Sequence, residues 1–300
     1  MHGDAESRPA PQTHLRPEPQ LALRHRVVVI VGGTTGLGFS AARACVEAGG
    51  QVVVVGRNPD SAKSAGQLLG AASARVLVAD ATDPSTAASA IDLALVDFGR
   101  FDALYHVAGG SGRRAGDGPL HDITDAGWDF TLRQNLTSLF YSNRAAARQF
   151  LKQNAAITPT AGAEGATASR VPGGTVLNMG SVLGFSPSAK YFSTHAYAAT
   201  KSAVIGFTRS CAAYYAPHNV RFNVIVPALI ETPMSQRAAG DDEIMRFIQT
   251  KQPLDGGRIG RPEDLDAAVV YLLSDQSRFC TGQVLTVDGG WSVSEGQWEE

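Results

Sequence analysis

Short runs of apolar, mostly β-branched residues recur along the chain, and each is bounded by glycine or polar residues. Such runs are typical of strands that are buried on both faces of a parallel sheet. Ala-rich stretches of helical length separate most of them, so predicted strands and helices alternate. The runs that we interpret as strands are residues 27–31, 52–55, 76–78, 103–107, 175–179, 220–226 and 284–287.

This alternation predicts an α/β protein with a Rossmann-like, doubly wound parallel sheet of about seven strands and helices on both faces. Ligands are expected beyond the carboxyl ends of the strands, where the strand order reverses. A length of 300 residues fits one large domain, which we place at residues 26–300. Residues 1–25 are predicted to form a mobile, disordered tail, and residues 154–174 a long surface loop.

The charge balance narrows the possible partners. A formal net charge of -2 and a pI near 6.4 supply no basic field, so we expect no nucleic acid and no membrane partner. No apolar stretch approaches the length of a membrane span, and the tail lacks the apolar core of a signal peptide. The cysteines, Cys45, Cys211 and Cys280, lie far apart and lack metal-ligand spacing. We therefore expect no metal site and a cytoplasmic protein that acts on a small molecule.

A glycine-rich segment joins the first predicted strand to a helix that ends at Gly49 and Gly50. Glycines let the backbone approach a pyrophosphate, whose charge is stabilised by free N–H groups at the start of the helix. A glycine-rich turn can also serve only to pack a helix closely on a strand. Within a strand, turn and helix unit, dinucleotide binding is the stronger interpretation. The segment consists of Gly32, Gly33, Thr34, Thr35, Gly36, Leu37 and Gly38.

Candidate acid–base chemistry lies at Tyr197 and Lys201, whose spacing puts both on one face of a predicted helix. A tyrosine titrates near pH 10, and a nearby cation at a dry site could lower its pKa toward neutrality. Ser181 follows the fifth predicted strand, where its hydroxyl can donate to a substrate oxygen. Asn135 lies in a helix-like stretch, where its amide can anchor a water that passes protons to solvent.

Each of these four residues also has an ordinary structural interpretation. Tyr197 could be a half-buried aromatic residue, Lys201 a solvated helix charge, Ser181 a helix cap and Asn135 a hydrogen bonder at a helix end. Their order along the chain, after the appropriate strands, favours catalysis.

Together the motifs resemble the short-chain dehydrogenase/reductase family in its single-domain form, from Arg26 to Val293. The resemblance implies that Tyr197 is the general acid in reduction and the base in oxidation. It implies that Lys201 lowers the tyrosine pKa and holds the nicotinamide ribose, that Ser181 orients the carbonyl and that Asn135 carries a proton-relay water. The function so implied is hydride transfer between NAD(P) and a carbonyl or alcohol. The motifs are the glycine loop, Ala108-Gly109, the four residues above, residues 227–232 and residues 286–290.

The same resemblance implies the contacts of the nicotinamide cofactor. Asp80 and Ala81 would border the adenine, while Ile230 and Thr232 would hold the carboxamide. The chain departs from the family pattern at His106 and Val107, which stand where an asparagine pair is usual. The implied cofactor contacts beyond the glycine loop are Arg57, Asp80, Ala81, Ala108, Gly109, Tyr197, Lys201, Pro227, Ile230 and Thr232.

The end of the second predicted strand bears on the choice of cofactor. An NAD site normally presents a carboxylate there for the ribose 2′-hydroxyl, whereas this chain has Arg57 and Asn58. A guanidinium suits a 2′-phosphate, so we expect NADP, with NAD as the alternative if Arg57 is a solvated turn residue.

The substrate itself is not identified by the sequence. Residues 234–254, together with Phe185, Phe192 and His195, are expected to cover the pocket. Arg113 and Arg114 either attract an acidic substrate or are solvated surface residues. The alternative function is a catalytically silent nicotinamide-binding regulator or scaffold of the same fold, and a dehydratase or epimerase is a further one. The resemblance implies a homodimer or homotetramer.

Overall fold

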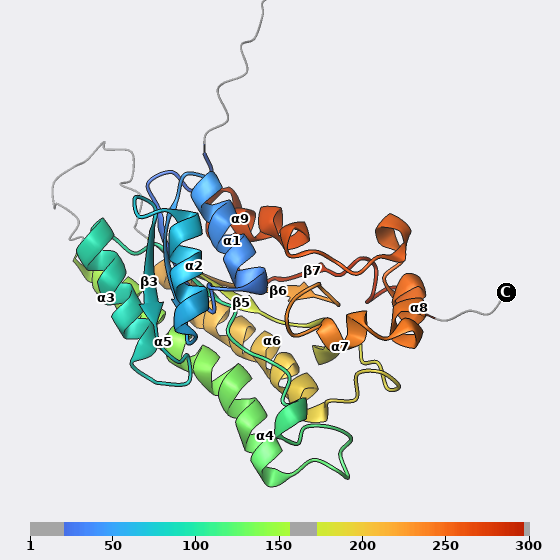
Figure 1. The fold of residues 1–300 in the computed structure, drawn as a ribbon. Helices are drawn as coiled ribbons and strands as arrows, with labels where there is room; N and C mark the ends of the chain where they lie inside the picture. Colours follow the sequence, from blue (N-terminus) through green and yellow to red (C-terminus); the bar gives the residue numbers. More distant parts are fainter. Residues whose placement is uncertain (1–20, 157–172, 297–300) are drawn as a thin grey trace, which may run out of the picture.

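A computed structural model describes residues 21–156 and 173–296. Its sheet has seven strands in the order β3-β2-β1-β4-β5-β6-β7, and all neighbouring strands are parallel (Figure 1). Every run predicted as a strand is one, with small shifts at the ends, so the predicted fold class is confirmed. The strands are β1 (Val27–Val31), β2 (Gln51–Gly56), β3 (Ala74–Val78), β4 (Ala103–His106), β5 (Gly174–Met179), β6 (Val220–Pro227) and β7 (Val284–Val287).

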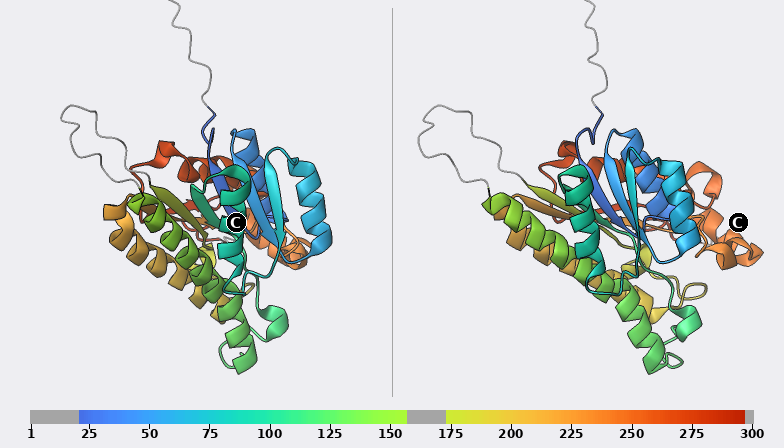
Figure 2. Two further views of the ribbon diagram at one scale, coloured as in Figure 1. Left: turned by 90° about the vertical axis from the view of Figure 1, so that its left-hand side faces the viewer. Right: turned by 60° about the vertical axis from the view of Figure 1, so that its left-hand side comes forward.

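Helices cover both faces of this sheet. One face is packed by α1, α2 and α9, and Figure 2 shows α3 and α5 on the other face, where α6 also packs. Three further helices, α4, α7 and α8, lie beyond the strand ends (Figure 1). The helices are α1 (Gly36–Glu47), α2 (Pro59–Leu69), α3 (Thr86–Phe98), α4 (Asp125–Leu132), α5 (Ser138–Ala155), α6 (His195–Tyr215), α7 (Gln236–Ala239), α8 (Asp242–Lys251) and α9 (Asp266–Leu273).

The central strand explains why the apolar runs are continuous rather than alternating. All five residues of β1 are fully buried, because successive side chains point to opposite faces and a helix layer covers each face. Val28 and Ile30 belong to the core beneath α1 and α9, while Val27 and Val29 belong to the core beneath α3 and α5.

The strand order reverses at β1, which lies between β2 and β4. The connections that leave β1 and β4 therefore diverge to opposite faces, and a crevice opens at the carboxyl ends of these strands. This is the expected position for a ligand.

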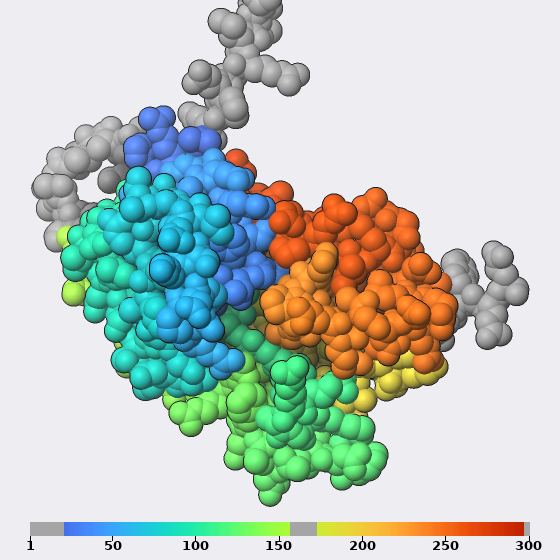
Figure 3. Space-filling view, in the orientation of Figure 1, coloured from blue at the N-terminus to red at the C-terminus, as the bar shows by residue number. Residues whose placement is uncertain are grey.

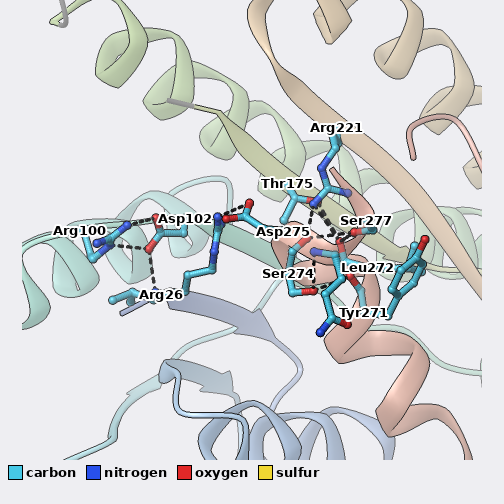
Figure 4. Close-up of polar contacts among 12 residues, drawn as sticks. Arg26, Arg100, Asp102, Thr175, Arg221, Tyr271, Leu272, Ser274, Asp275 and Ser277 are labelled. Carbon is cyan, nitrogen blue, oxygen red and sulfur yellow. Dashed lines mark hydrogen bonds and ion pairs between the residues drawn. The ribbon is translucent and has the colours of Figure 1, made fainter. Parts of the chain in front are cut away.

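The opposite, amino-terminal edge of the sheet is closed by a polar network (Figure 4). Asp102 Oδ2 accepts from Val27 N at 2.8 Å, and its carboxylate also pairs with Arg100 at 2.7 Å. Arg26 pairs with Asp275 at 2.5 Å, and Arg221 Nη2 donates to the Ser274 carbonyl at 3.0 Å. These contacts join β1, β4 and β6 to the segment after α9.

Two predicted boundaries need correction. Residues 21–25 were predicted to belong to the tail, but they form a turn in which Leu23 is fully buried and its N–H donates to Ala48 O at 3.0 Å. Leu23 fills the core beside α1, so the ordered chain begins before Arg26. The predicted loop began at Asn154, yet α5 continues to Ala155. The rest of the predicted tail, residues 1–20, and residues 157–172 of the predicted loop lie outside the described residues.

Within residues 21–156 and 173–296, no helix has the length and apolar character that crossing a membrane requires. The same residues contain no cluster of three or more histidine, cysteine, aspartate or glutamate side chains suited to a metal ion. Cys45, Cys211 and Cys280 all carry free thiols.

Candidate active site

The glycine loop turns the chain from β1 into α1 by backbone contacts. Gly32 N and Gly33 N both donate to Val55 O, at 2.9 and 3.0 Å, which fixes the loop to β2. A Cβ on Gly38 would lie 2.0 Å from the Gly32 carbonyl oxygen, so the helix can approach the loop only because residue 38 has no side chain. Thr35, at the N-cap of α1, makes no side-chain capping bond, and the first turn holds no acidic residue. The start of α1 is therefore suited to an anion.

Segments that follow other strands border this loop. A Cβ on Gly32 would meet Ala108 N at 2.6 Å, and one on Gly36 would meet Thr232 Cγ2 at 3.5 Å. The structure thus brings together the loops after β1, β4 and β6, as a dinucleotide that spans the crevice requires. The absence of side chains at Gly32 and Gly38 lets these segments pack closely around the start of α1, and the predicted residues Ala108 and Thr232 lie against the loop.

The loop after β6 is held in place by its own bonds. Ile230 is buried and forms a bridge with Gly260, and Glu231 N donates to Gly260 O at 2.7 Å. Thr232 N donates to Ser235 Oγ at 2.9 Å, which fixes the turn that leads into α7. The predicted residues Pro227, Ile230 and Thr232 therefore lie on a rigid segment.

Arg57 follows β2 and is exposed to solvent. Its neighbour Asn58 caps α2 by accepting from Asp60 N and Ser61 N, each at 2.9 Å. The Thr82 backbone N–H, which donates to the Asp80 carboxylate, lowers the pKa of Asp80, and the Arg57 charge lowers it further. Arg57 and Asp80 therefore lie at the same end of the crevice, while the loop after β3 also carries Ala81.

Asn135 lies in a π-helical turn, Arg133–Thr137, between α4 and α5, and it is 1% exposed. Its Oδ1 accepts from Gly110 N at 3.0 Å, and its Nδ2 donates to Gly110 O at 2.9 Å and Thr131 O at 3.0 Å. Both amide hydrogens are engaged, so the side chain has one Oδ1 lone pair left for a water. The amide clamps the loop after β4, and its role in a proton relay stays a prediction.

The predicted Ser181, Tyr197 and Lys201 meet beyond the end of β5. Ser181 is nearly buried and forms a side-chain hydrogen bond with Tyr197, which comes from the first turn of α6. The Lys201 Nζ atom lies 5.4 Å from the centroid of the Tyr197 ring and donates to Met179 O at 3.0 Å. A Cβ on Gly109 would meet Asn135 Oδ1 at 2.6 Å and Lys201 Nζ at 3.7 Å, so Asn135 belongs to the same cluster.

Burial is the main influence on the protonation of this cluster. Burial raises the pKa of Tyr197, and the hydrogen bond with Ser181 offsets this only in part by lowering it. The Lys201 ammonium lies beside the ring and donates to a carbonyl, so its charge does not offset the effect of burial, and its role in lowering the tyrosine pKa stays a prediction. Burial also lowers the pKa of Lys201 to about 8. The phenol is therefore protonated at neutral pH, and most of the lysine is still charged.

Comparison with known proteins now assigns the chain to a family. A family model described as enoyl-(acyl carrier protein) reductase matches residues 31–292. The chain is 32% identical over 277 residues to 2-(S)-hydroxypropyl-CoM dehydrogenase 3 of Xanthobacter autotrophicus, covering 90% of this chain and 98% of that one. The chain belongs to the short-chain dehydrogenase/reductase family.

Other members of this family show the same likeness. A 2-dehydro-3-deoxy-D-gluconate 5-dehydrogenase of Dickeya dadantii is 32% identical, over 90% of this chain and 96% of its own length. The structure of a short-chain type dehydrogenase/reductase from Mycobacterium ulcerans matches with a TM-score of 0.79 and 30% identity, over 92% of each chain. The protein is accordingly an enzyme, an NAD(P)-dependent oxidoreductase that transfers a hydride between the nicotinamide and a carbonyl or alcohol.

Sequence reasoning missed one residue that positions the tyrosine of this short-chain dehydrogenase/reductase. Asp117, in the loop after β4, is 4% exposed, and its two carboxylate oxygens accept from Ala196 N at 3.0 Å and Tyr197 N at 2.9 Å. The neighbouring Gly118 O accepts from His195 N at 3.2 Å. Asp117 thus caps α6 from outside the helix. Nothing near residue 197 signals this, since the cap is 79 and 80 residues away from its partners.

His106, noted only as a departure from the family pattern, lies buried behind the cluster. Its Nδ1 is 3.0 Å from Ser142 Oγ and its Nε2 is 3.4 Å from Ser138 Oγ, so the ring joins β4 to the start of α5. Burial lowers the pKa of His106 to about 3, and the Lys201 charge contributes to the lowering. The imidazole is neutral, and it helps to hold the π-helical turn that carries Asn135.

Proposed function

We propose that Tyr197 is the proton donor when this oxidoreductase reduces a carbonyl, and the proton acceptor in the reverse direction. The observation that carries the proposal is the hydrogen bond between Ser181 and Tyr197, with Lys201 buried beside it at the carboxyl edge of the sheet. A phenol whose pKa is raised by burial holds its proton at neutral pH. Reduction can therefore begin without prior protonation of the enzyme.

Ser181 would donate a hydrogen bond to the substrate oxygen and so orient the carbonyl toward the Tyr197 hydroxyl. Lys201, still largely cationic below pH 8, would favour the phenolate that forms when Tyr197 gives up its proton. Asn135 would keep the loop after β4 close to the lysine by its bonds to Gly110. A water on its free lone pair would connect the site to solvent.

The nicotinamide dinucleotide, when bound, supplies or accepts the hydride. The residues that would hold its pyrophosphate are those of the glycine loop and the first turn of α1. Lys201 would bond the ribose next to the nicotinamide, while Ile230 and Thr232 would hold the carboxamide. Ala108 and Gly109 would line the crevice between these ends, and Asp80 and Ala81 would border the adenine.

We further propose NADP as the cofactor rather than NAD, because an exposed guanidinium at residue 57 takes the place of the acid that an NAD site would present. The relative from Dickeya dadantii is named for a sugar acid, which supports an oxidised or hydroxylated acid as substrate. A homodimer or homotetramer in the cytoplasm completes the proposal. The silent regulator or scaffold has no observation in its favour.

A coupled assay with NADP and NAD over ketones, aldehydes, oxo acids and their alcohols tests this function. Tyr197→Phe should lower kcat by about 10² to 10⁴-fold while the dissociation constant of the dinucleotide, measured by fluorescence titration, stays the same. Tyr214→Phe, at an exposed ring on the same helix, is the matched control and should retain full activity. Full activity of Tyr197→Phe would refute the catalytic assignment. A wild-type protein that binds dinucleotide and turns over no substrate would favour the regulator.

A further inference from the structure

Two exposed arginines from different segments, Arg113 and Arg237, lie close enough for their charges to interact. Arg113 belongs to the short helical turn Arg113–Ala115 in the loop after β4, and Arg237 belongs to α7, which follows β6. Burial lowers the pKa of Arg113, and the positive charge of Arg237 lowers it further. Within residues 21–156 and 173–296, neither arginine has a carboxylate within salt-bridge distance.

Backbone and side-chain contacts place the segments that carry this pair beside the loops that surround the catalytic cluster. A Cβ on Gly110 would meet Met234 Cε at 3.8 Å, so the loop that leads to Arg113 contacts the segment that leads to Arg237. Arg237 Nη2 also donates to Tyr191 O, at 3.4 Å, in the loop after β5. Figure 3 shows this face hollowed between the green segment after β4 and the orange segment around α7.

Two acids of the surrounding segments are already engaged. Asp117, whose charge acts on Arg113, gives both carboxylate oxygens to the backbone of α6. Glu243 of α8 pairs with Lys190 at 2.5 Å and accepts from the Tyr191 hydroxyl at 3.1 Å. Two like charges held close together repel each other, and the repulsion is relieved when an anion lies between them.

We propose that Arg113 and Arg237 together bind a carboxylate of the substrate, while its carbonyl or hydroxyl lies at Ser181 and Tyr197. The substrate class is then an oxo acid or hydroxy acid. Each guanidinium presents a planar fork of donors that matches a carboxylate, so two from different loops also fix its orientation. The inference rests on the proposed function for the position of the reacting group, but the anion subsite can be tested without turnover.

The test measures the thermal unfolding of the protein in the presence of saturating dinucleotide. Cyclohexanecarboxylate is the probe, and cyclohexanecarboxamide, which has the same ring but no charge, is the control compound. The carboxylate should raise the Tm of the wild-type protein by about 2–4 °C more than the amide does, at a concentration near ten times its dissociation constant. Arg113→Gln and Arg237→Gln should each remove this difference. Arg278→Gln, at an exposed arginine near the start of β7, should keep it.

A kinetic arm compares 4-oxocyclohexanecarboxylate with its methyl ester. Each single variant should lower the ratio of kcat/KM for acid over ester about tenfold, and the dissociation constant of the dinucleotide should not change. Equal shifts of Tm for acid and amide in the wild-type protein would overturn the proposal. So would a loss of dinucleotide affinity in Arg237→Gln, since that guanidinium would then bind the cofactor.

One further variant separates this proposal from the proposed function. Tyr197→Phe retains both arginines, so it should keep the carboxylate-specific Tm shift even though its turnover is lost. If the shift remains and Tyr197→Phe is still fully active, the catalytic assignment fails and the subsite stands. If the shift is missing and Tyr197→Phe is inactive, the subsite fails and the catalytic assignment stands.

Discussion

The two edges of the central sheet use charged residues in opposite ways. At the amino-terminal edge, Asp102 bonds both Arg100 and the Val27 N–H, Arg26 pairs with Asp275, and Arg221 donates to backbone carbonyls (Figure 4). Each of these charges has a partner supplied by the fold. Removing one of them leaves its partner with an unmet hydrogen bond, but no reacting group is nearby.

At the carboxyl-terminal edge the fold holds charges in less favourable settings. Lys201 is 3% exposed and donates to a carbonyl, and Arg113 lies near the like charge of Arg237. Burying the Lys201 charge costs stability, whereas solvent screens the repulsion between the exposed Arg113 and Arg237. Perturbed ionisable groups cluster where ligands and reactions need them. The comparison teaches that the amino-terminal edge is built for stability and that the carboxyl-terminal edge sacrifices some stability for chemistry.

The largest expected loss of stability comes from breaking the amino-terminal edge. Asp102→Ala leaves the fully buried Val27 N–H without its acceptor and Arg100 without its ion pair. We expect the free energy of unfolding to fall by about 3 kcal/mol in urea denaturation, while kcat of the folded protein does not change. Asp122→Ala, at an exposed acid, is the control. A tenfold fall in kcat at a temperature where Asp102→Ala is fully folded would contradict the division between the edges.

Asp117 tests the other edge, because it caps the helix that carries Tyr197. Asp117→Ala should cost about 1–2 kcal/mol of stability and lower kcat about 10 to 100-fold, since a small displacement of the reacting phenol is costly. The KM for the dinucleotide should change little. Asp117→Asn keeps one acceptor oxygen and should recover part of kcat. Equal kcat in the wild type and Asp117→Ala would show that α6 is held by its packing alone.

The buried histidine at the end of β4 predicts a pH dependence of stability. The pKa of His106 in the folded protein is about 3, below the ordinary 6.5, so the unfolded chain takes up the proton first as the pH falls. Stability is therefore lost from pH 6.5 downward, by about 1.4 kcal/mol per unit for this group. Between pH 6 and 5, His106→Gln should remove this group's contribution to the slope of the free energy of unfolding against pH, measured by denaturation. His121→Gln, at an exposed ring, should not. Unchanged slopes in both variants would refute the assignment.

The smallest effect is expected at the cofactor end of the crevice, where Arg57 is exposed and its contact would be partly screened by solvent. Arg57→Gln should lower the preference for NADP over NAD, expressed as a ratio of kcat/KM, by about threefold to tenfold. The effect should shrink at high salt. Lys63→Gln, at a lysine of α2, serves as the control. A wild-type preference for NAD would contradict the cofactor proposal.

The sequence by itself determined those features that depend on neighbours in the chain. Apolar runs of strand length, separated by helices, predicted the seven strands and the layers around them. The glycine loop and the one-turn spacing of Tyr197 and Lys201 could be identified for the same reason, because strand and helix periodicities act over a few residues.

Only the tertiary structure decided the contacts between distant segments and the ionisation states of the groups that these contacts bury. The cap of α6 by Asp117, the approach of Arg113 to Arg237 and the burial of Leu23 each link residues that no local pattern relates. The upward shift of the Tyr197 pKa likewise follows from burial, which depends on all the atoms that the fold packs around the side chain. Periodicity encodes which face of an element is buried, whereas desolvation and long-range pairing depend on what the folded chain brings against that face.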